Sequence, residues 1–551
     1  MSTVAQQLAE WICSVRYEDI PERVLEKTRY QTLSVIASMH AGADTNAGQA
    51  VLRAATKWRK PGPCTVIPTG QQMALHEAVM VNSAFSMALD YDDYLYMGHT
   101  GHSAVLGAWA ICEEERLSTR ELITAQVIAN EIGGRVGASA VLGPQNGQAW
   151  SFIHAVEGAA LASRLYGLSV EQTAHAIAIA MYQPTFTLWP GFMGPTSKVL
   201  TAAGPTITGI QAAQFAREGL TGAPEIFEHP RKGFWKFFTF VPLPKMLTGL
   251  GESWVSDTLA YKKYPGCAYI DTTMDALFDV LGQYHERHDR ALGAADVKSI
   301  DVTASLLSVE MDNLSAEHVD ESQPLSPVNI NFSIGFNVAI GILGGAHTGA
   351  QMSQDFLDAN DKEIRRLSAM TKLHHDWEMT TRVAGAFDKV LGRSSVLGQL
   401  SARELVRVAR GYQSELGGRK KNSADFGALI RRHGGDLLRQ VRELPRRMSR
   451  VRARAADNGG ADLGGVDFSK FEMTFPARVT IETKSGESFT ARKDVPLGVS
   501  ARKDYRETVE QKFRTETAAQ LGETQVENAL TRLRRFEDER LQELTKYFCQ
   551  P

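Results

Sequence analysis

Residues 90–103, Asp-Tyr-Asp-Asp-Tyr-Leu-Tyr-Met-Gly-His-Thr-Gly-His-Ser, place three carboxylates and two imidazoles within fourteen positions. The segments on either side, 78–89 and 104–112, are mostly small and apolar, as buried helices are. Charge set between buried helices costs free energy unless it is paired or used. The stretch therefore predicts a loop that joins two buried helices and forms one wall of an active site. The alternative is a helix–helix turn with aspartate caps and surface histidines, and this stretch alone leaves both open.

Helical patterns dominate the chain up to about residue 260. Pro21 opens a helix that runs to about His40, with the proline in its first turn. Ser118 and Ser169 each begin a capping box, with Glu or Gln three residues later and an apolar helical run behind it. These patterns predict a large all-α domain over residues 1–262.

Strand patterns appear beyond Tyr264. They alternate and are rich in β-branched or aromatic side chains, and the last two are joined by a hairpin turn that contains glycine. The four segments are 297–308, 471–475, 479–483 and 488–491. The fold class is therefore mainly α, with a smaller α+β domain over residues 263–503. The charged tail, 504–551, has helical spacing and is expected to dock back on the helical domain.

A basic tract lies inside the second domain. Residues 403–454 contain 15 Arg and Lys against 5 Asp and Glu. Such a tract can bind polyanions. We expect a solvated helical insertion or a dimer contact instead, because aromatic residues are nearly absent between the charges.

Composition favours a cytoplasmic protein. The net charge of -3 suggests neither a nucleic acid nor a membrane as partner. The five cysteines are widely spaced without a CxxC motif, which predicts no disulfide framework or zinc site and fits a reducing cytosol. The N-terminus has no signal-peptide pattern, and no window of about 20 residues is apolar enough to span a bilayer.

The first candidate cluster is Asp90, Asp92, Asp93, His99 and His102. A carboxylate or an imidazole from it can act as a general base, since histidine needs only a small pKa shift to act near neutrality. His-x-x-His with a nearby aspartate can also bind a metal, but this spacing fixes no third ligand. We therefore predict no metal.

Lys198 follows Thr196 and Ser197 at the expected start of a small-residue helix, 199–217. A lysine there adds to the positive end of the helix dipole and favours an anionic substrate, and the two hydroxyls can donate further hydrogen bonds. The alternative is that Ser197 caps the helix and Lys198 is a surface charge.

Two more candidates lie elsewhere. Lys262, Lys263 and Tyr264 stand at the domain boundary, where two cations and a phenol suit carboxylates, although a plain basic linker is the alternative. His154 lies on a helix that enters the core, where a lone histidine is more often structural. Motifs for nucleotides, flavins and common hydrolases (GxGxxG, the P-loop, GxSxG and HExxH) do not occur in the expected contexts, so we predict no cofactor.

Taken in order, these segments resemble the MmgE/PrpD family. The ordered set is 82–93, 131–135, 157–169, 196–213, 262–267, 331–333 and 512–513. The resemblance implies a large all-α domain with an α+β lid, a homodimer, and a site between the domains. It also implies cofactor-free lyase or isomerase chemistry on small di- or tricarboxylates. By position, Asp90, Lys198 and Lys262 match site residues, and either His99 or His102 matches the family histidine.

This sequence differs from the family pattern at positions that bear on which reaction it catalyses. Met87 stands where many members have histidine, Gln148 lies near the position of a catalytic histidine of the decarboxylase, and residues from about 376 to 468 form an insertion. We predict a dehydratase that abstracts a proton beside a carboxylate and expels a β-leaving group, from an acid such as 2-methylcitrate. The alternatives are a decarboxylase or an epimerase of the same family, a metal-dependent hydrolase, and a non-catalytic binding protein.

The predicted site divides into two groups. The catalytic group is Asp90, His99, His102 and Lys198, and the substrate-binding group is Asp93, His154, Thr196, Ser197, Lys262, Lys263 and Tyr264.

Overall fold

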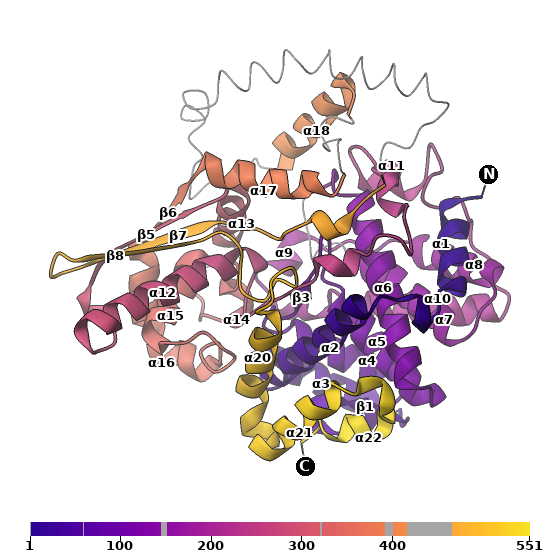
Figure 1. The fold of residues 1–551 in the computed structure, drawn as a ribbon, viewed down its shortest axis with the longest axis horizontal. Helices are drawn as coiled ribbons and strands as arrows, with labels where there is room; N and C mark the ends of the chain where they lie inside the picture. Colours follow the sequence, from indigo (N-terminus) through magenta and orange to yellow (C-terminus); the bar gives the residue numbers. More distant parts are fainter. Residues whose placement is uncertain are drawn as a thin grey trace.

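A computed structural model describes residues 2–58, 60–144, 151–319, 322–391, 400–415 and 465–550. Helices account for most of its regular structure, so the predicted mainly α class is confirmed (Figure 1). Within these ranges, no helix is long and apolar enough to cross a membrane.

The N-terminal part is a layered stack of helices with two short strand pairs. Its helices are α1 (Val4–Ser14), α2 (Glu22–Ala43), α3 (Asn46–Trp58), α4 (Leu75–Met87), α5 (Gly101–Glu115), α6 (Thr119–Ser139), α7 (Phe152–Leu165), α8 (Val170–Met181), α9 (Trp189–Phe192), α10 (Ala203–Arg217) and α11 (Phe234–Phe238). Its strands are β1 (Cys64–Val66) with β2 (Gln71–Met73), and β3 (Asp93–Tyr94) with β4 (Ala260–Tyr261).

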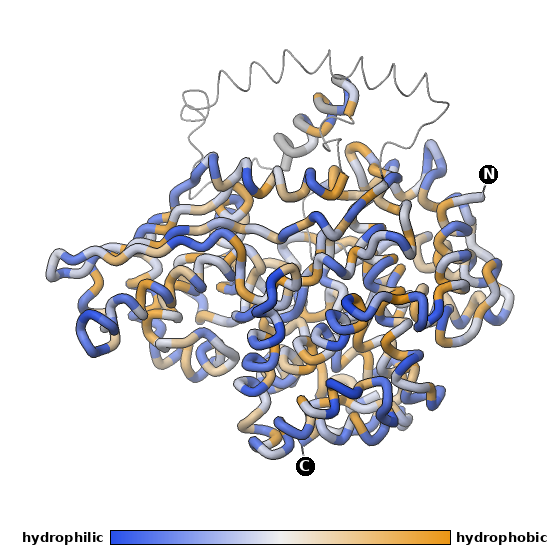
Figure 2. Tube along the Cα trace, in the orientation of Figure 1, coloured by the Kyte–Doolittle hydropathy of each residue, from blue (hydrophilic) through white to orange (hydrophobic). Residues whose placement is uncertain are grey.

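Local sequence signals set the helix starts. The Ser118 and Ser169 hydroxyls cap α6 and α8 as predicted, and α2 begins directly after Pro21. Helix α10 begins at Ala203 rather than at residue 199, so that Pro205 falls in its first turn, where proline is tolerated. Hydrophobic segments concentrate in the interior and hydrophilic ones at the outer turns (Figure 2).

The second part is built on a four-stranded sheet in the order β6-β5-β7-β8, in which only β5 and β6 are parallel. The strands are β5 (Val297–Ala304), β6 (Thr371–His375), β7 (Ala477–Thr483) and β8 (Ser488–Lys493). The helices are α12 (Asp271–His288), α13 (Leu306–Ala316), α14 (Pro327–Ile330), α15 (Ile334–Gly344), α16 (Gln354–Met370), α17 (Trp377–Lys389) and α18 (Ala402–Glu415). In Figure 1, α12, α15 and α16 lie below the sheet and α17 lies above it.

One predicted strand is wrong. Residues 471–475 pair with no strand in the described part of the chain. Their alternating apolar side chains, Phe471, Met473 and Phe475, are buried against the helical core instead. The predicted strands at 479–483 and 488–491 are confirmed. The strand predicted over 297–308 ends at Ala304, and α13 begins at Leu306.

The C-terminal tail forms α20 (Tyr505–Leu521), α21 (Glu523–Leu533) and α22 (Leu541–Lys546). Helix α20 lies beside α2 and buries Val509 and Phe513 in the core of the N-terminal helices (Figure 1). The tail therefore belongs physically to the first half of the chain.

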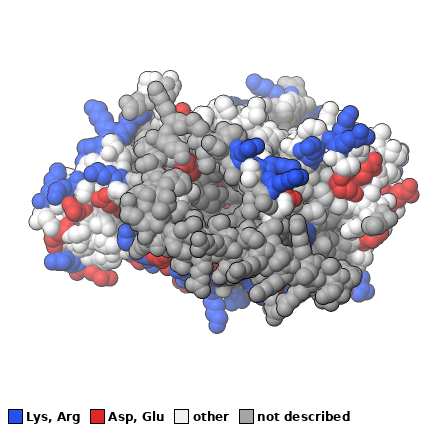
Figure 3. Space-filling view, turned by 90° about the horizontal axis from the view of Figure 1, so that it is seen from above, with Lys and Arg blue, Asp and Glu red and all other residues white. Residues whose placement is uncertain are grey.

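Buried apolar side chains form one large cluster in the helical part and a second one around the sheet. The domain boundary at 262/263 stays a prediction. Most of the basic tract, residues 416–454, lies outside the described residues. On the face shown in Figure 3, described side chains of both signs stand close together at either end.

Candidate active site

A short strand pair assembles the site from distant parts of the sequence. Strand β3 pairs with β4 in the register Asp93↔Tyr261, and the Lys262 amide donates to the Asp92 carbonyl at 3.1 Å. Helix α4 has ended before this point, and Asp90 adopts a left-handed backbone with φ of 52°. The predicted loop between two buried helices is thereby confirmed, and its aspartates are buried rather than surface caps.

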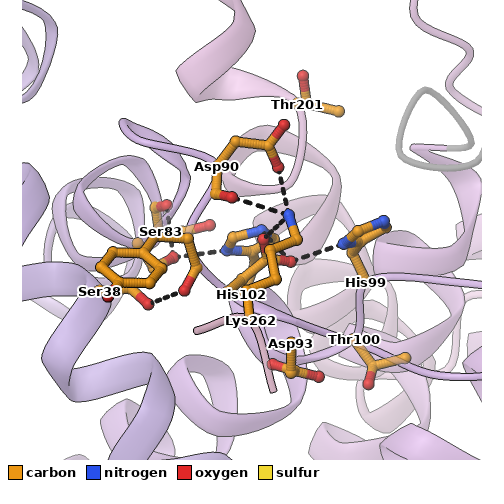
Figure 4. A network of polar contacts seen from close by, with 12 residues as sticks. Ser38, Ser83, Asp90, Asp93, His99, Thr100, His102, Thr201 and Lys262 are labelled. Atoms are coloured by element: carbon orange, nitrogen blue, oxygen red, sulfur yellow. Dashed lines mark hydrogen bonds and ion pairs between the residues drawn. The ribbon is translucent and has the colours of Figure 1, made fainter. Parts of the chain in front are cut away.

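Asp90 is held between two buried lysines. Lys262 Nζ lies 2.6 Å from Asp90 Oδ1, and Lys198 Nζ lies 2.8 Å from Asp90 Oδ2. Lys262 also contacts Asp92 Oδ1 at 2.7 Å. Figure 4 shows Lys262 between Asp90 and His99. The four charges sum to zero inside the protein.

This pairing sets opposite pKa shifts. Burial raises the pKa of Asp90, but the charges of Lys198 and Lys262 outweigh it and bring the pKa to about 2. Burial lowers the pKa of Lys198, and its ion pair with Asp90 only partly opposes this. Burial also acts to lower the pKa of Lys262, yet two aspartates leave it above the ordinary value. Lys262 is therefore a permanent cation, whereas Lys198 gives up its proton more easily than an exposed lysine.

His99 is oriented by Asp92. His99 Nδ1 lies 2.8 Å from Asp92 Oδ2, and His102 Nε2 lies 3.0 Å from the same oxygen. Burial lowers the pKa of His99 despite the charge of Asp92, so the ring is neutral at neutral pH. When Nδ1 carries the proton donated to Asp92, Nε2 is the basic nitrogen. His102 turns its other nitrogen to Ser86 Oγ at 2.7 Å.

A cavity of about 240 Å³ opens against this cluster. Asp90, His99 and Lys262 line it directly, and Lys198 reaches it through Asp90. The remaining lining is mostly aromatic or apolar and comes from both halves of the chain. It comprises Tyr94, Leu95, Tyr96, Met97, Gly98, Val141, Trp189, Phe192, Cys267, Ala268, Tyr269, Leu307, Met311, Phe332, Phe387, Met473 and Phe475.

Three predicted residues lie near the cluster without lining the cavity. His102 is fully buried behind Asp92. Asp93 faces away toward Gln31, whose Nε2 donates to its carboxyl at 2.7 Å. His154 shares a hydrogen bond of 2.8 Å with Ser103 and lies 3.5 Å from Glu157, as a structural histidine does.

Four other predicted substrate ligands point elsewhere. Thr196 and Ser197 are exposed, because the turn Thr196–Leu200 buries Lys198 and Val199 instead, and Ser197 Oγ donates to the Gly191 carbonyl. Tyr264 donates to Asp275 at 2.9 Å, and Lys263 lies 4.0 Å from the same carboxyl. None of these four lines the cavity, and their proposed contact with a substrate has no geometric support.

The aromatic lining was missed at the level of sequence. The alternation of residues 471–475 places apolar side chains on one face, but it also predicts a strand rather than a cavity wall. Among the described residues, no group of three or more His, Cys, Asp or Glu is placed to hold a metal ion.

Comparisons with known proteins agree with this architecture. The family model of the MmgE/PrpD N-terminal domain matches residues 6–244, and that of the MmgE/PrpD C-terminal domain matches residues 264–399. The chain belongs to the MmgE/PrpD family. The predicted resemblance is thereby confirmed.

Curated relatives include two fungal proteins. A cis-aconitate decarboxylase from Aspergillus terreus is 26% identical over 357 residues, which cover 62% of this chain and 71% of the relative. The cis-aconitate decarboxylase-like protein oryM from Aspergillus oryzae is 24% identical over 304 residues, which cover 52% of this chain and 63% of the relative.

Proposed function

We propose that this MmgE/PrpD protein is a cofactor-independent lyase that acts on a di- or tricarboxylic acid by dehydration. The observation that carries the proposal is the cavity wall in which a neutral, Asp92-oriented His99 adjoins the Lys198–Asp90–Lys262 ion network. A base beside fixed cations is what proton abstraction next to a carboxylate requires.

The reaction uses each group once. His99 Nε2 takes the proton from the carbon beside the substrate carboxylate, and Asp92 stabilises the imidazolium that forms. Lys262 stabilises the enolate-like charge as a permanent cation. The electron pair then forms the carbon–carbon double bond, and the β-hydroxide leaves as water with a proton that Lys198 gives up through the Asp90 carboxylate.

Decarboxylation is the second candidate, and the names of the relatives favour it. In this case the bond to a carboxyl carbon breaks, carbon dioxide leaves, and the carbanion takes up a proton that Lys198 supplies through Asp90. Dehydration places negative charge on the carbon that loses its proton, and decarboxylation places it on the carbon that loses its carboxyl group. The product distinguishes the two reactions. Gln148, the departure that led us to prefer dehydration, lies outside the described residues.

Proton NMR in D₂O on 2-hydroxy and unsaturated di- and tricarboxylates tests the proposal. We expect deuterium at the carbon beside a carboxylate and a new vinyl signal, with loss of carbon dioxide marking decarboxylation instead. Lys198→Met keeps the side-chain length over the Phe192 and Phe332 rings but removes the charge, and should lower the rate by about 10²–10³.

The matched control is Lys298→Met, on an exposed lysine of β5 far from the cavity. It should react at the wild-type rate. A folded Lys198→Met protein with full activity, or silence of the wild type across the panel, would overturn the proposal.

A further inference from the structure

The charged groups of the cavity lining are confined to one place. Asp90, His99 and Lys262 are joined to one another through Asp92 and direct ion pairs. Among the described residues that line the cavity, no further lysine and no arginine occurs. A substrate with charge on every side would therefore leave some of that charge facing apolar walls.

The cations of the cluster are already paired. Lys262 contacts two aspartates, and Lys198 contacts Asp90. A buried carboxylate of a substrate costs free energy unless a cation compensates it. Among the described residues, the two lysines of the network are matched by Asp90 and Asp92. Attraction to carboxylates is therefore a weak source of affinity in this cavity.

Two pairs of aromatic side chains form two of the apolar walls of the cavity. Phe192 and Phe332 lie 5.8 Å apart beneath the Lys198 ammonium. Tyr269 and Phe475 meet edge to face at 4.8 Å. Such surfaces gain free energy by covering apolar groups of a ligand.

A third wall combines aromatic and flexible side chains. Tyr96 and Phe387 lie 5.2 Å apart, and Met97, Met311 and Met473 stand among the aromatic residues of the lining. Methionine adapts its shape to irregular apolar ligands. We call the part of the cavity bounded by these aromatic and methionine side chains the apolar chamber.

We infer that the substrate carries a bulky apolar substituent, alkyl or aryl, which fills the apolar chamber while its carboxylate and reacting carbon lie at the Asp90–His99–Lys262 cluster. This inference rests on the proposed lyase function for the position of the reacting carbon. It assigns the affinity to the substituent and the chemistry to the polar cluster. Small, fully polar acids such as citrate are then poor ligands.

A series of 2-alkylsuccinates tests the inference by calorimetry. Methyl, butyl, hexyl and octyl members share one head group, differ only in apolar length, and have no hydroxide to lose. We expect the dissociation constant to fall about threefold to fourfold per methylene until the chamber is full, and octylsuccinate to bind more tightly than citrate. A flat series, or tighter binding of citrate, would overturn the inference.

Leu307→Phe narrows the chamber without touching the polar cluster, since Leu307 lines the cavity as a partly buried side chain of α13. It should weaken octylsuccinate binding at least tenfold and change methylsuccinate binding less than twofold. The matched control is Leu343→Phe, at a partly buried leucine of α15 beside the other core cluster. It should leave both affinities unchanged; equal losses in the two variants would contradict the assignment.

Exchange of the carbon-bound proton separates this inference from the proposed function. Graded binding without deuterium uptake by any acid would retain the apolar chamber and reject lyase chemistry. Deuterium uptake or turnover without dependence on alkyl length would retain the chemistry and reject the apolar substituent.

Discussion

At the scale of single residues, the surroundings of each group in the site set its protonation state. His99 is kept neutral by burial, and Asp90 is kept ionised by two lysines. Asp92 holds His99 and Lys262 at once, through its two oxygens. Asp92 is therefore a positioning residue whose removal should alter the behaviour of His99.

The pH dependence of kcat/KM reports on that residue. Because burial lowers the pKa of His99, the neutral base persists below pH 6.5, and activity should fall only as the pH drops through that lowered value. Asp92→Asn removes a charge that raises the His99 pKa, so the acid limb should move to still lower pH. The rate should also fall by about 10²–10⁴, since the ring loses its orienting acceptor. An acid limb above pH 6.5 in the wild type would rule out His99 as the base.

At the scale of helices and strands, features that depend on adjacent residues can be predicted from the sequence, whereas features that depend on distant residues cannot. The capping boxes at Ser118 and Ser169 predicted two helix starts because a cap involves only adjacent residues. Alternation predicts a strand at Phe475, but a strand also needs a partner that its own sequence does not reveal. The exposure of Thr196 and Ser197 is hard to predict for a similar reason, since the direction of each side chain in the turn depends on its packing against distant parts of the chain.

The first residue of α5 lies very close to the Asp motif, which is the segment Asp90–Asp93. A Cβ on Gly101 would lie 1.9 Å from Asp93 Oδ1, whereas one on Gly204, in the first turn of α10, would meet nothing within 4 Å. Gly101→Ala should lower the free energy of unfolding by about 1–3 kcal/mol. Gly204→Ala should leave it unchanged or raise it by up to about 1 kcal/mol. Urea unfolding of both variants measures the difference; equal stabilities would show that the contact relaxes freely.

At the scale of the whole molecule, the two ends of the chain meet behind the site. Lys512 of α20 donates to Ser34 Oγ at 2.9 Å and to the Tyr91 carbonyl, in the middle of the Asp motif. Its ammonium also lies 4.0 Å from the centre of the Tyr91 ring. Helical spacing in the tail predicts that it docks on the helical part, but it does not predict this contact, since Tyr91 and Lys512 lie 421 positions apart in the sequence.

This buried lysine makes stability depend on pH in a defined direction. Burial lowers the pKa of Lys512 to about 7, against about 10.4 in an unfolded chain. Between these values the unfolded chain holds a proton that the folded protein lacks, so stability rises with pH by up to about 1.4 kcal/mol per unit. Lys512→Met should remove that slope and stabilise the protein near pH 7. It should also lower kcat/KM, because the Tyr91 carbonyl between Asp90 and Asp92 loses its hydrogen-bond donor.

The control is Lys546→Met, at an exposed lysine of the same tail, which should change neither the dependence of stability on pH nor kcat/KM. If Lys512→Met kept the wild-type dependence of stability on pH, as Lys546→Met should, Lys512 would be charged in the folded protein throughout this pH range. Its hydrogen bond to the Tyr91 carbonyl would then come from an ammonium group at every pH tested.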